Sequence, residues 1–370
     1  MAHSLSDSIT AGLIDAVEQG WTPLPLVRLA IRRLCAAQLR ALTQGGPEVA
    51  ALQQLQFRDQ SLDGPIAHVP ELANAQHYEV PAEFYRLVLG PRLKYSSCYW
   101  ADGVDTLAEA EVAALRETAL HAELEDGQRV LELGCGWGSL TFWMLERYPN
   151  LTVTAVSNSH SQRRHMLAEA SRRGFSERLR VITADMNDFE ADDEYDRVVS
   201  VEMFEHLRNH RRALERIASW LAPGGKLFVH IFCHRQYAYA FGDGKAADWM
   251  GRNFFSGGMM PSDRWLDECG GGMLLEQQWR WNGRHYARTA AAWIANMERH
   301  RGELLDILTA THGRHEAARW FRKWRLLFLA GEEMFGMYGG EEWYVSHYRF
   351  APAAQRNPNR QTTLSANGKH

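Results

Sequence analysis

Apolar residues near the N-terminus follow the spacing of an amphipathic helix. In PLVRLAIRRLCAAQLRAL they recur every three or four positions with arginines between them, which is the period of a helix with one apolar face. We therefore expect helices within residues 9–43, as part of an N-terminal helical extension that covers residues 1–76. A basic amphipathic helix can cover a core or an active site, or it can lie on a lipid surface, and we favour the first use.

Short apolar runs bounded by turn residues indicate strands further along the chain. These runs lie at residues 129–133, 151–156, 178–183, 197–202 and 226–232. A helix is expected from residue 106, and helical patterns separate the early runs. Strands that alternate with helices predict an α/β fold with a mostly parallel sheet flanked by helices.

The catalytic unit is expected to span residues 77–350, after a turn-rich connector at 44–76. Strand periodicity fades after the fifth run, where Gly, Trp and Tyr accumulate, and helical spacing returns at 300–336. We interpret residues 235–336 as a helical substrate cap inserted into this unit. Residues 351–370 are polar, offer little to bury and are expected to be disordered.

The amino-acid composition indicates which partners and which cellular compartment to expect for this protein. The net charge of −4 gives no basic field for nucleic acid phosphates, so nucleic acid is not expected as a partner. The five scattered cysteines form neither metal-ligand pairs nor a disulfide framework, which favours a reducing cytoplasm. No signal-peptide pattern and no run of about 18 apolar residues occurs, so we expect a soluble protein without stable membrane association.

The first expected strand runs directly into a glycine-rich loop. VLELGCGWGSL places Gly134, Gly136 and Gly138 between the strand and a helix. Glycines at this position let the backbone approach a ligand at the carboxyl edge of a Rossmann-like sheet. The loop alone is weak support, because dinucleotide dehydrogenases share it and glycine turns also serve packing.

Residues around the loop favour S-adenosylmethionine (SAM) over a dinucleotide. Glu132 precedes the loop inside the strand, and the third strand ends in ITADM, with Asp185 followed by Met186. These features resemble the methyltransferase pattern. A dinucleotide enzyme should end its second strand with an acidic residue for the ribose hydroxyls, yet this strand ends in AVSNSHSQ, with Asn158 and Gln162.

Acidic and histidine residues gather where the fourth expected strand ends. RVVSVE continues as MFEHL, which places Glu202 at the carboxyl edge of the sheet and Glu205 and His206 on the following turn. This edge borders the ligand crevice of open α/β sheets. A carboxylate and an imidazole there could remove a proton from a substrate. Alternatively, Glu205 caps the next helix and His206 packs beneath it.

Seven segments carry a family resemblance that runs from about residue 9 to 350. In chain order they are HYEVPAEFYRLVLG, LKYSSCYW, VLELGCGWGSL, VSVEMFEHL, FCHRQYAYAF, FFSGGMMP and GGEEWYVSHYRF. Together they resemble the cyclopropane fatty acid synthase superfamily, and within it the plant coclaurine N-methyltransferase group, which methylates benzylisoquinoline alkaloid amines.

The resemblance implies a class I SAM methyltransferase fold with a seven-stranded, mostly parallel sheet. It also implies SAM as cofactor, S-adenosylhomocysteine as product, and no metal. Tyr95 and Ser96, with Asn158 and Gln162, would then complete the cofactor site. A homodimer is one option for the assembly, which the sequence does not decide.

The resemblance leaves two reactions open: methylation of an amine, and cyclopropanation of an unsaturated acyl chain with help from a bound bicarbonate. Cyclopropane synthases resemble this chain at Glu205 and His230, but usually have Cys at the position of Ser97 and Gly at the position of Glu202. A further carboxylate there would repel bicarbonate and attract an ammonium group, so Coulomb's law favours the amine. A protein that binds SAM without catalysis is a third option, against which the intact acidic and histidine residues argue.

Aromatic residues are expected to enclose a flat or cationic substrate, although packing explains any single one. The expected substrate contacts are Ser97, Phe204, His230, Tyr237, Tyr239, Phe241, Phe254, Phe255, Trp324 and Phe328.

Overall fold

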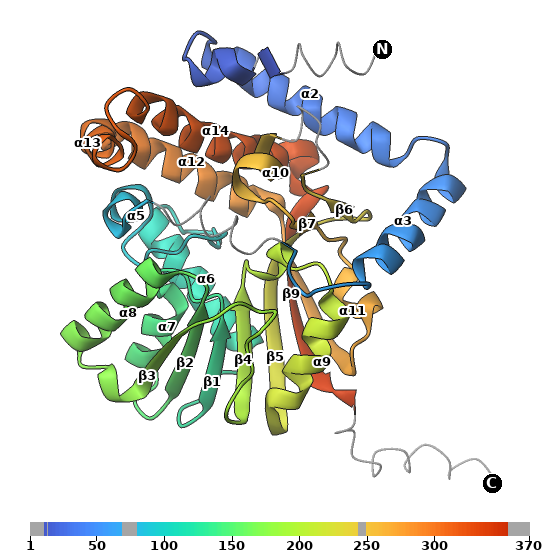
Figure 1. Ribbon diagram of the computed structural model, residues 1–370, viewed down its shortest axis with the longest axis vertical. Helices are drawn as coiled ribbons and strands as arrows, with labels where there is room; N and C mark the ends of the chain where they lie inside the picture. Colours follow the sequence, from blue (N-terminus) through green and yellow to red (C-terminus); the bar gives the residue numbers. More distant parts are fainter. Residues whose placement is uncertain (1–10, 13, 69–79, 243–248, 354–370) are drawn as a thin grey trace.

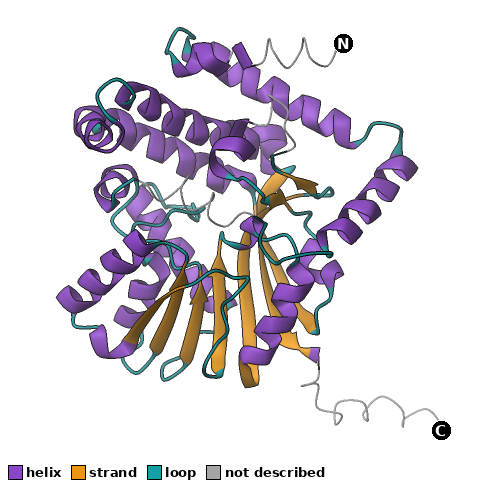
Figure 2. Cartoon of the chain, in the orientation of Figure 1, coloured by secondary structure: helices purple, strands orange, loops and turns teal. Residues whose placement is uncertain are grey.

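A computed structural model of the chain describes residues 11–12, 14–68, 80–242 and 249–353. Its centre is a seven-stranded sheet in the order β3-β2-β1-β4-β5-β9-β8 (Figures 1 and 2). The strands are β1 (Arg129–Leu133), β2 (Thr152–Ser157), β3 (Leu179–Thr183), β4 (Tyr195–Val201), β5 (Leu221–His234), β8 (Met273–Trp281) and β9 (Trp343–Pro352). The first five are parallel, and β9 lies antiparallel between β5 and β8. The predicted fold class is therefore confirmed.

In the sheet, β2 lies on one side of β1 and β4 lies on the other, so the strand order reverses at β1. In open α/β sheets, ligands bind beside the carboxyl ends of the strands at such a reversal of strand order. The ends of β1 and β4 carry the glycine loop and Glu202, so the topology brings these two motifs together.

Helices cover both faces of the sheet because the central strands are apolar on both sides. On one face, Leu131 and Leu133 belong to a core cluster with Leu214 and Ile217 of α9 (His210–Trp220). The other face packs against α6 (Leu107–His121), α7 (Ser139–Arg147) and α8 (His160–Arg173). A strand buried on both faces needs a continuous apolar run, which is the pattern that predicted β1, β2 and β4.

A helical layer lies above the carboxyl edge of the sheet (Figure 1). It contains α12 (Gly283–Arg299), α13 (Arg301–His312) and α14 (Ala317–Gly336), which pack with α5 (Ala82–Val88) around a second apolar core. The short elements β6 (Tyr239–Ala240), α10 (Trp249–Phe254) and β7 (Met259–Met260) join this layer to the sheet. The cavity described below lies under this layer.

The helix α2 (Leu24–Leu42) crosses the top of the molecule and rests on α14 (Figure 1). Arg28 pairs with Glu332 at 2.8 Å and with Glu333 at 2.5 Å, and Arg32 also pairs with Glu333. These arginines therefore hold α2 against α14 of the helical layer. None of the described helices has the length and apolar character needed to cross a membrane.

Several segments differ from the sequence prediction. The connector at 44–76 contains the helix α3 (Pro47–Ser61), which leaves Leu52 and Leu55 exposed and therefore lacks a clear apolar face. The strand β8 lies within residues 235–336, which we predicted as the substrate cap. It is an edge strand with polar, partly exposed positions, so its sequence lacks the apolar pattern of a buried strand. Residues 351–352 belong to β9 and not to a tail. The rest of that tail, from 354, and residues 77–79 lie outside the described residues.

Candidate active site

The glycine loop combines two kinds of glycine. Gly134 and Gly138 have φ of 83° and 87°, and an added Cβ would come within 2.7 Å of Met203 or 2.4 Å of Met166. Gly136 has φ of 54°, but nothing lies within 4 Å of its added Cβ. Gly134 and Gly136 line the cavity, whereas Gly138 caps α7 beside an outer hollow. The third glycine thus serves packing, and the second faces the space where a ligand would lie.

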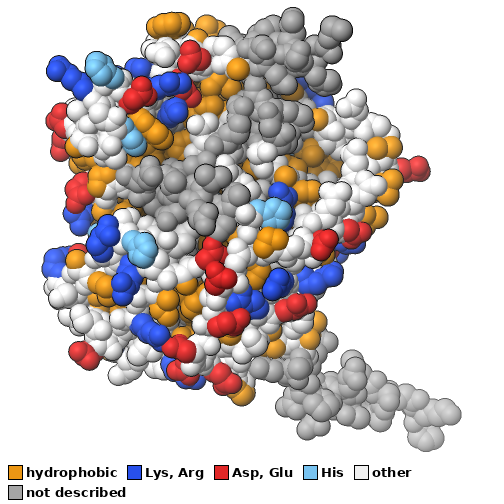
Figure 3. Space-filling view, viewed as in Figure 1, with side chains coloured by type: hydrophobic (Ala, Val, Ile, Leu, Met, Phe, Trp, Pro, Cys, Tyr) orange, Lys and Arg blue, Asp and Glu red, His pale blue; other side chains and the backbone are white. Residues whose placement is uncertain are grey.

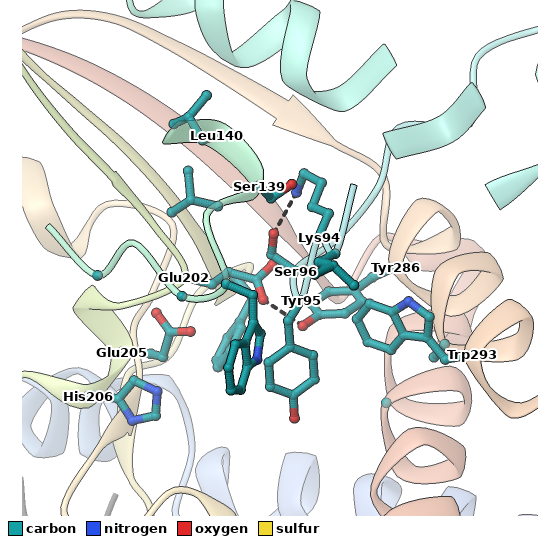
Figure 4. Close-up of a pocket in the computed structure, with 18 of the residues that line it drawn as sticks. Lys94, Tyr95, Ser96, Ser139, Leu140, Glu202, Glu205, His206, Tyr286 and Trp293 are labelled. Carbon is teal, nitrogen blue, oxygen red and sulfur yellow. Dashed lines mark hydrogen bonds between the residues drawn. The ribbon is translucent and has the colours of Figure 1, made fainter. Parts of the chain in front are cut away.

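The cavity lies between this loop, the end of β4 and the helical layer. Of the residues predicted from the sequence, those on its wall are Tyr95, Ser96, Glu132, Gly134, Gly136, Gln162, Glu202, Glu205, His206, Phe241, Phe255 and Phe328. Figure 4 shows the acidic residues and His206 around one space, with Tyr95, Tyr286 and Trp293 opposite. The structure therefore gathers residues from both the sheet and the cap into a single site.

Glu132 is buried and accepts a hydrogen bond from the Thr141 hydroxyl. Burial raises the pKa of its carboxyl to about 8, although this hydrogen bond lowers it. Without a bound cation, this group is therefore mainly the neutral acid at neutral pH. A cation bound near it would favour the carboxylate, and SAM carries both an ammonium and a sulfonium group. Glu132 thus suits the positively charged cofactor.

This coupling predicts a pH dependence of SAM affinity. If SAM lowers the pKa of Glu132, binding releases a proton, so affinity should rise by up to about tenfold per pH unit below pH 8 and flatten above it. Titration calorimetry between pH 6 and 7.5 would measure the rise. Glu132→Gln should bind more weakly and lose most of this pH dependence. An equal pH dependence in that variant would show that another group is responsible.

Gln162 is, after Glu132, the second polar residue of the cavity wall that we expected to contact the cofactor. Its Oε1 atom accepts a hydrogen bond from the Ser157 hydroxyl at 2.6 Å, and its Nε2 atom has no hydrogen-bond partner among the described residues. A buried amide donor without a partner costs free energy, so it is available to a ligand. Asn158 and Met186 are half-buried outside the described wall, and Asp185 accepts from the Asn187 backbone amide at 2.6 Å. Cofactor contacts by these three residues remain predictions.

Lys94 is a charged residue of the cavity wall that the sequence did not predict. It lies on the cavity wall, is almost completely buried, and donates to the Ser96 hydroxyl and the Ser97 carbonyl, both at 2.6 Å (Figure 4). Burial lowers the pKa of its ammonium group, while the nearby Cys98, Glu202 and Glu111 oppose this shift. Lys94 thus holds the segment of residues 94–97 in place. Its position inside the quoted LKYSSCYW segment was the one available signal.

Glu202 is the centre of a hydrogen-bond network. Its Oε1 atom accepts from the Ser97 amide at 2.9 Å and lies 3.1 Å from His230 Nε2. Its Oε2 atom accepts from the Tyr286 hydroxyl at 2.6 Å (Figure 4). Its φ of 46° is in the left-handed region, an uncommon conformation for glutamate that the structure must compensate. These three contacts fix the Glu202 carboxyl, which in turn holds Ser97, His230 and Tyr286 in position.

Tyr286 was not predicted, because it lies on α12, 84 residues from Glu202 in the chain. Ser97 and His230 are not on the described cavity wall, and they reach the site through Glu202. Their described contact is with Glu202, and direct contact with substrate stays a prediction. Burial raises the pKa of the Glu202 carboxyl, and the charge of Lys94 partly opposes that effect.

Glu205 and His206 lie on a short 3₁₀ turn (Phe204–His206) after β4. The Oε2 atom of Glu205 is buried without a hydrogen-bond partner among the described residues. Burial, and then the charge of Glu202, raise the pKa of Glu205 well above its ordinary value. The His206 ring stacks on Phe255 at 5.6 Å, and burial lowers its pKa to about 4. The site thus contains an acidic group that a cation could ionise beside a neutral imidazole.

The remaining predicted substrate contacts divide between the cavity wall and the layers behind it. Phe241 and Phe328 lie on the wall. Phe204, Phe254 and Trp324 are fully buried in the apolar cores and are not on the described wall, so their contact with substrate stays a prediction. Tyr237 lies in a surface hollow beside Arg235, and Tyr239 accepts from the Trp343 indole at 3.1 Å. The helical layer adds Trp293, Met334 and Phe335 to the wall.

Comparison with known proteins places this site in a family. Residues 68–336 match the family model described as mycolic acid cyclopropane synthetase. The chain is 33% identical to (S)-coclaurine N-methyltransferase of Thalictrum flavum subsp. glaucum over 347 residues, which cover 93% of this chain and 96% of that enzyme. It is 27% identical to cyclopropane-fatty-acyl-phospholipid synthase of Escherichia coli over 276 residues, 71% of this chain and 69% of that enzyme.

A solved structure agrees with the sequence comparison. The crystal structure of coclaurine N-methyltransferase bound to N-methylheliamine and S-adenosylhomocysteine superposes with a TM-score of 0.88 at 31% identity, over 92% of this chain and 99% of that chain. The shared fold, the cofactor product bound in that relative and the family match agree with the glycine loop and the acidic cavity. The protein is therefore a SAM-dependent methyltransferase and belongs to the mycolic acid cyclopropane synthetase family.

Proposed function

We propose that the protein transfers the methyl group of SAM to the nitrogen of a small amine with a flat aromatic ring system, such as an isoquinoline alkaloid. The observation that carries this proposal is the buried Oε2 atom of Glu205, which has no hydrogen-bond partner among the described residues, in a cavity whose wall also carries several Phe, Tyr and Trp side chains. Aromatic faces and carboxylates are the groups that attract an organic cation. The relatives named as N-methyltransferases of coclaurine and pavine support the same substrate class.

An amine substrate requires the site to remove a proton. An alkylamine is mainly protonated at neutral pH, and only its neutral form has the lone pair that attacks the methyl group. A base works best when its pKa lies near the working pH. Burial raises the pKa of Glu205 toward such a value, so Glu205 suits the role of proton acceptor. Binding of the ammonium group would favour ionisation of this carboxyl before the proton moves.

The other groups have supporting roles in this proposal. Glu202 keeps the residue 94–97 segment, α12 and β5 in register through its three hydrogen bonds. Gln162 and Glu132 would hold the cofactor, and Phe255 and His206 would present a stacked wall to the substrate ring. When bound, SAM supplies the methyl group, and the protein aligns nitrogen, carbon and sulfur.

An acceptor screen tests the proposal. Purified protein and SAM would be incubated with secondary aromatic amines, with matched phenols, and with vesicles of unsaturated phospholipid. We expect S-adenosylhomocysteine and a methylated product with the amines, and neither with the other two classes. An acyl chain that gains one methylene unit would instead support the cyclopropane synthase alternative, and methylated phenols would move the acceptor to oxygen. Either result would overturn the amine proposal.

We also infer a cytoplasmic location and no nucleic acid partner. All five cysteines are free, and four of them are buried, as expected in a reducing compartment. On the face shown in Figure 3, basic and acidic side chains are mixed and form no basic stripe. Division of the chain into an N-terminal extension, a core and a cap remains a proposal, as does a homodimeric assembly.

A further inference from the structure

Three buried histidines lead away from Glu202 through the sheet. His230 on β5 and His347 on β9 are paired across the antiparallel strands, so their side chains lie on the same face. His121 lies in the last turn of α6, which packs on that face. Neither the glycine loop nor the cavity wall includes His347 or His121. We call His230, His347 and His121 the histidine row.

The row is continuous in its contacts. Glu202 Oε1 lies 3.1 Å from His230 Nε2, and His230 Nδ1 lies 2.8 Å from His347 Nε2. His347 Nδ1 then lies 2.8 Å from His121 Nδ1, and His121 Nε2 lies 3.5 Å from the Glu117 carboxylate. Each ring therefore uses both of its nitrogens along one line. The Glu117 side chain is 34% exposed, so the line begins at the cavity and ends at solvent.

Aromatic rings shield the inner part of the row from water. His230 and His347 have no exposed surface, and both contact the Trp281 ring. His121 stacks on Trp279 with ring centroids 3.9 Å apart and planes at 10°. Burial lowers the pKa of all three rings, to about 4 for His121, which keeps them neutral. A neutral imidazole has one donor and one acceptor nitrogen, so one proton per ring satisfies every contact.

We propose that the histidine row carries the proton lost by the substrate from Glu202 to the surface at Glu117. This inference rests on the proposed function, since methylation of a protonated amine releases one proton in the cavity at each turnover. Glu205 takes the proton first, and Glu202, whose side chain lies on the same cavity wall (Figure 4), is the next acceptor. A buried polar cluster needs internal hydrogen bonds in any case, but packing alone does not require that they join the cavity to solvent.

The transfer balances as a series of proton shifts. The Glu202 carboxyl gives its proton to His230 Nε2 while the proton on His230 Nδ1 moves to His347 Nε2. The proton on His347 Nδ1 moves to His121 Nδ1, and the proton on His121 Nε2 leaves for Glu117 or water. Each ring gains one proton and loses one, so all three stay neutral, and Glu202 becomes a carboxylate. The tautomers reset before the next turnover.

The test replaces the outermost ring and compares it with a matched histidine elsewhere. His312 also lies in the last turn of a helix, α13, and stacks on a tryptophan, Trp320, at 4.3 Å and 13°. We expect His121→Ala to lower kcat for amine methylation by about tenfold or more, with KM, SAM affinity and melting temperature near the wild-type values. His312→Ala should keep the wild-type kcat.

Chemical rescue separates proton transfer from a structural defect. Imidazole added to His121→Ala can occupy the space left beside Trp279, so it should restore most of the lost kcat in a concentration-dependent way. His347→Gln interrupts the row at a fully buried position, and we expect the same loss without rescue. Folded His121→Ala protein with wild-type kcat, or a loss that imidazole leaves unchanged, would overturn the relay.

A second measurement needs no methyl transfer. Nitrogen NMR of histidine-labelled protein reports which ring nitrogen carries the proton. We expect Glu202→Gln to change the tautomer signal of His121, across two intervening rings, and to leave His312 unchanged. An unchanged His121 signal would show that the rings are not coupled. If the wild-type protein methylates no amine, the proposed function fails, and this measurement alone decides whether the row is connected.

Discussion

Glu205→Gln is expected to lower kcat for amine methylation by about 10²-fold or more, the usual contribution of general-base assistance. Glutamine keeps the shape of the side chain but cannot accept the proton. Because burial raises the pKa of Glu205, the ionised base becomes more abundant as pH rises. Wild-type activity should therefore increase with pH through this pKa and be lost as pH falls below it. Steady-state rates from pH 6 to 9 would measure both effects.

The variant should recover part of its activity at high pH. Bulk water supplies more neutral amine as the pH approaches the substrate's own pKa, so the need for an internal base declines. Glu215→Gln, an exposed glutamate on α9, is the control and should behave as wild type. If Glu205→Gln binds SAM and methylates amines at the wild-type rate near neutral pH, the proton acceptor is another group.

His206→Ala is expected to lower kcat by a similar factor, about 10²-fold, if His206 and Glu205 act together. Residues that serve one step give non-additive losses. The double variant should therefore lose less than the product of the two single losses. Fully multiplicative losses would indicate that the two side chains act independently, with His206 serving only to shape the wall through its stacking on Phe255.

Gly136→Val is expected to abolish SAM binding, which we define as at least a 100-fold loss of affinity by calorimetry, about 2.7 kcal/mol. The added side chain would occupy the cavity above the loop, where nothing lies within 4 Å of its Cβ. A valine at φ of 54° also strains the backbone, at a cost of roughly 1–2 kcal/mol. The protein should therefore fold with a modestly lower melting temperature and fail to bind.

Gly127 provides the matched control for this strain. It has φ of 82°, an added Cβ there also meets nothing within 4 Å, and it lies in the turn before β1, away from the cavity wall. Gly127→Val should show a similar drop in melting temperature with normal SAM affinity. Unchanged affinity in Gly136→Val would remove the loop from the cofactor site, and equal losses in both variants would attribute the defect to strain.

The amino-acid sequence by itself determined the features that depend on local pattern. Continuous apolar runs predicted β1 and β4, because strands buried on both faces need apolar side chains at every position. The run GCGWG predicted the loop, since backbone with φ near +60° to +90° selects glycine wherever it occurs. Glu202, Glu205 and His206 were placed at the crevice because they directly follow a parallel strand.

Only the tertiary structure decided which distant side chains meet. Tyr286 reaches Glu202 from 84 residues away, and His347 reaches His230 from 117 residues away. Both contacts exist because β9 enters antiparallel beside β5 and because α12 lies over the edge of the sheet. Spacing along the chain contains no signal for such pairs, so the network around Glu202 and the histidine row could not be predicted.

The structure also decided which aromatic residues line the cavity. Phe241 and Trp324 are equally apolar in the sequence, yet one lies on the wall and the other is completely buried behind it. The structure was also needed to identify the edge strand β8. Its polar positions face solvent on one side, so its sequence resembles that of a loop. Hydrophobicity predicts that a side chain is buried, but the packing of elements that are distant in the chain determines whether it faces a ligand or the core.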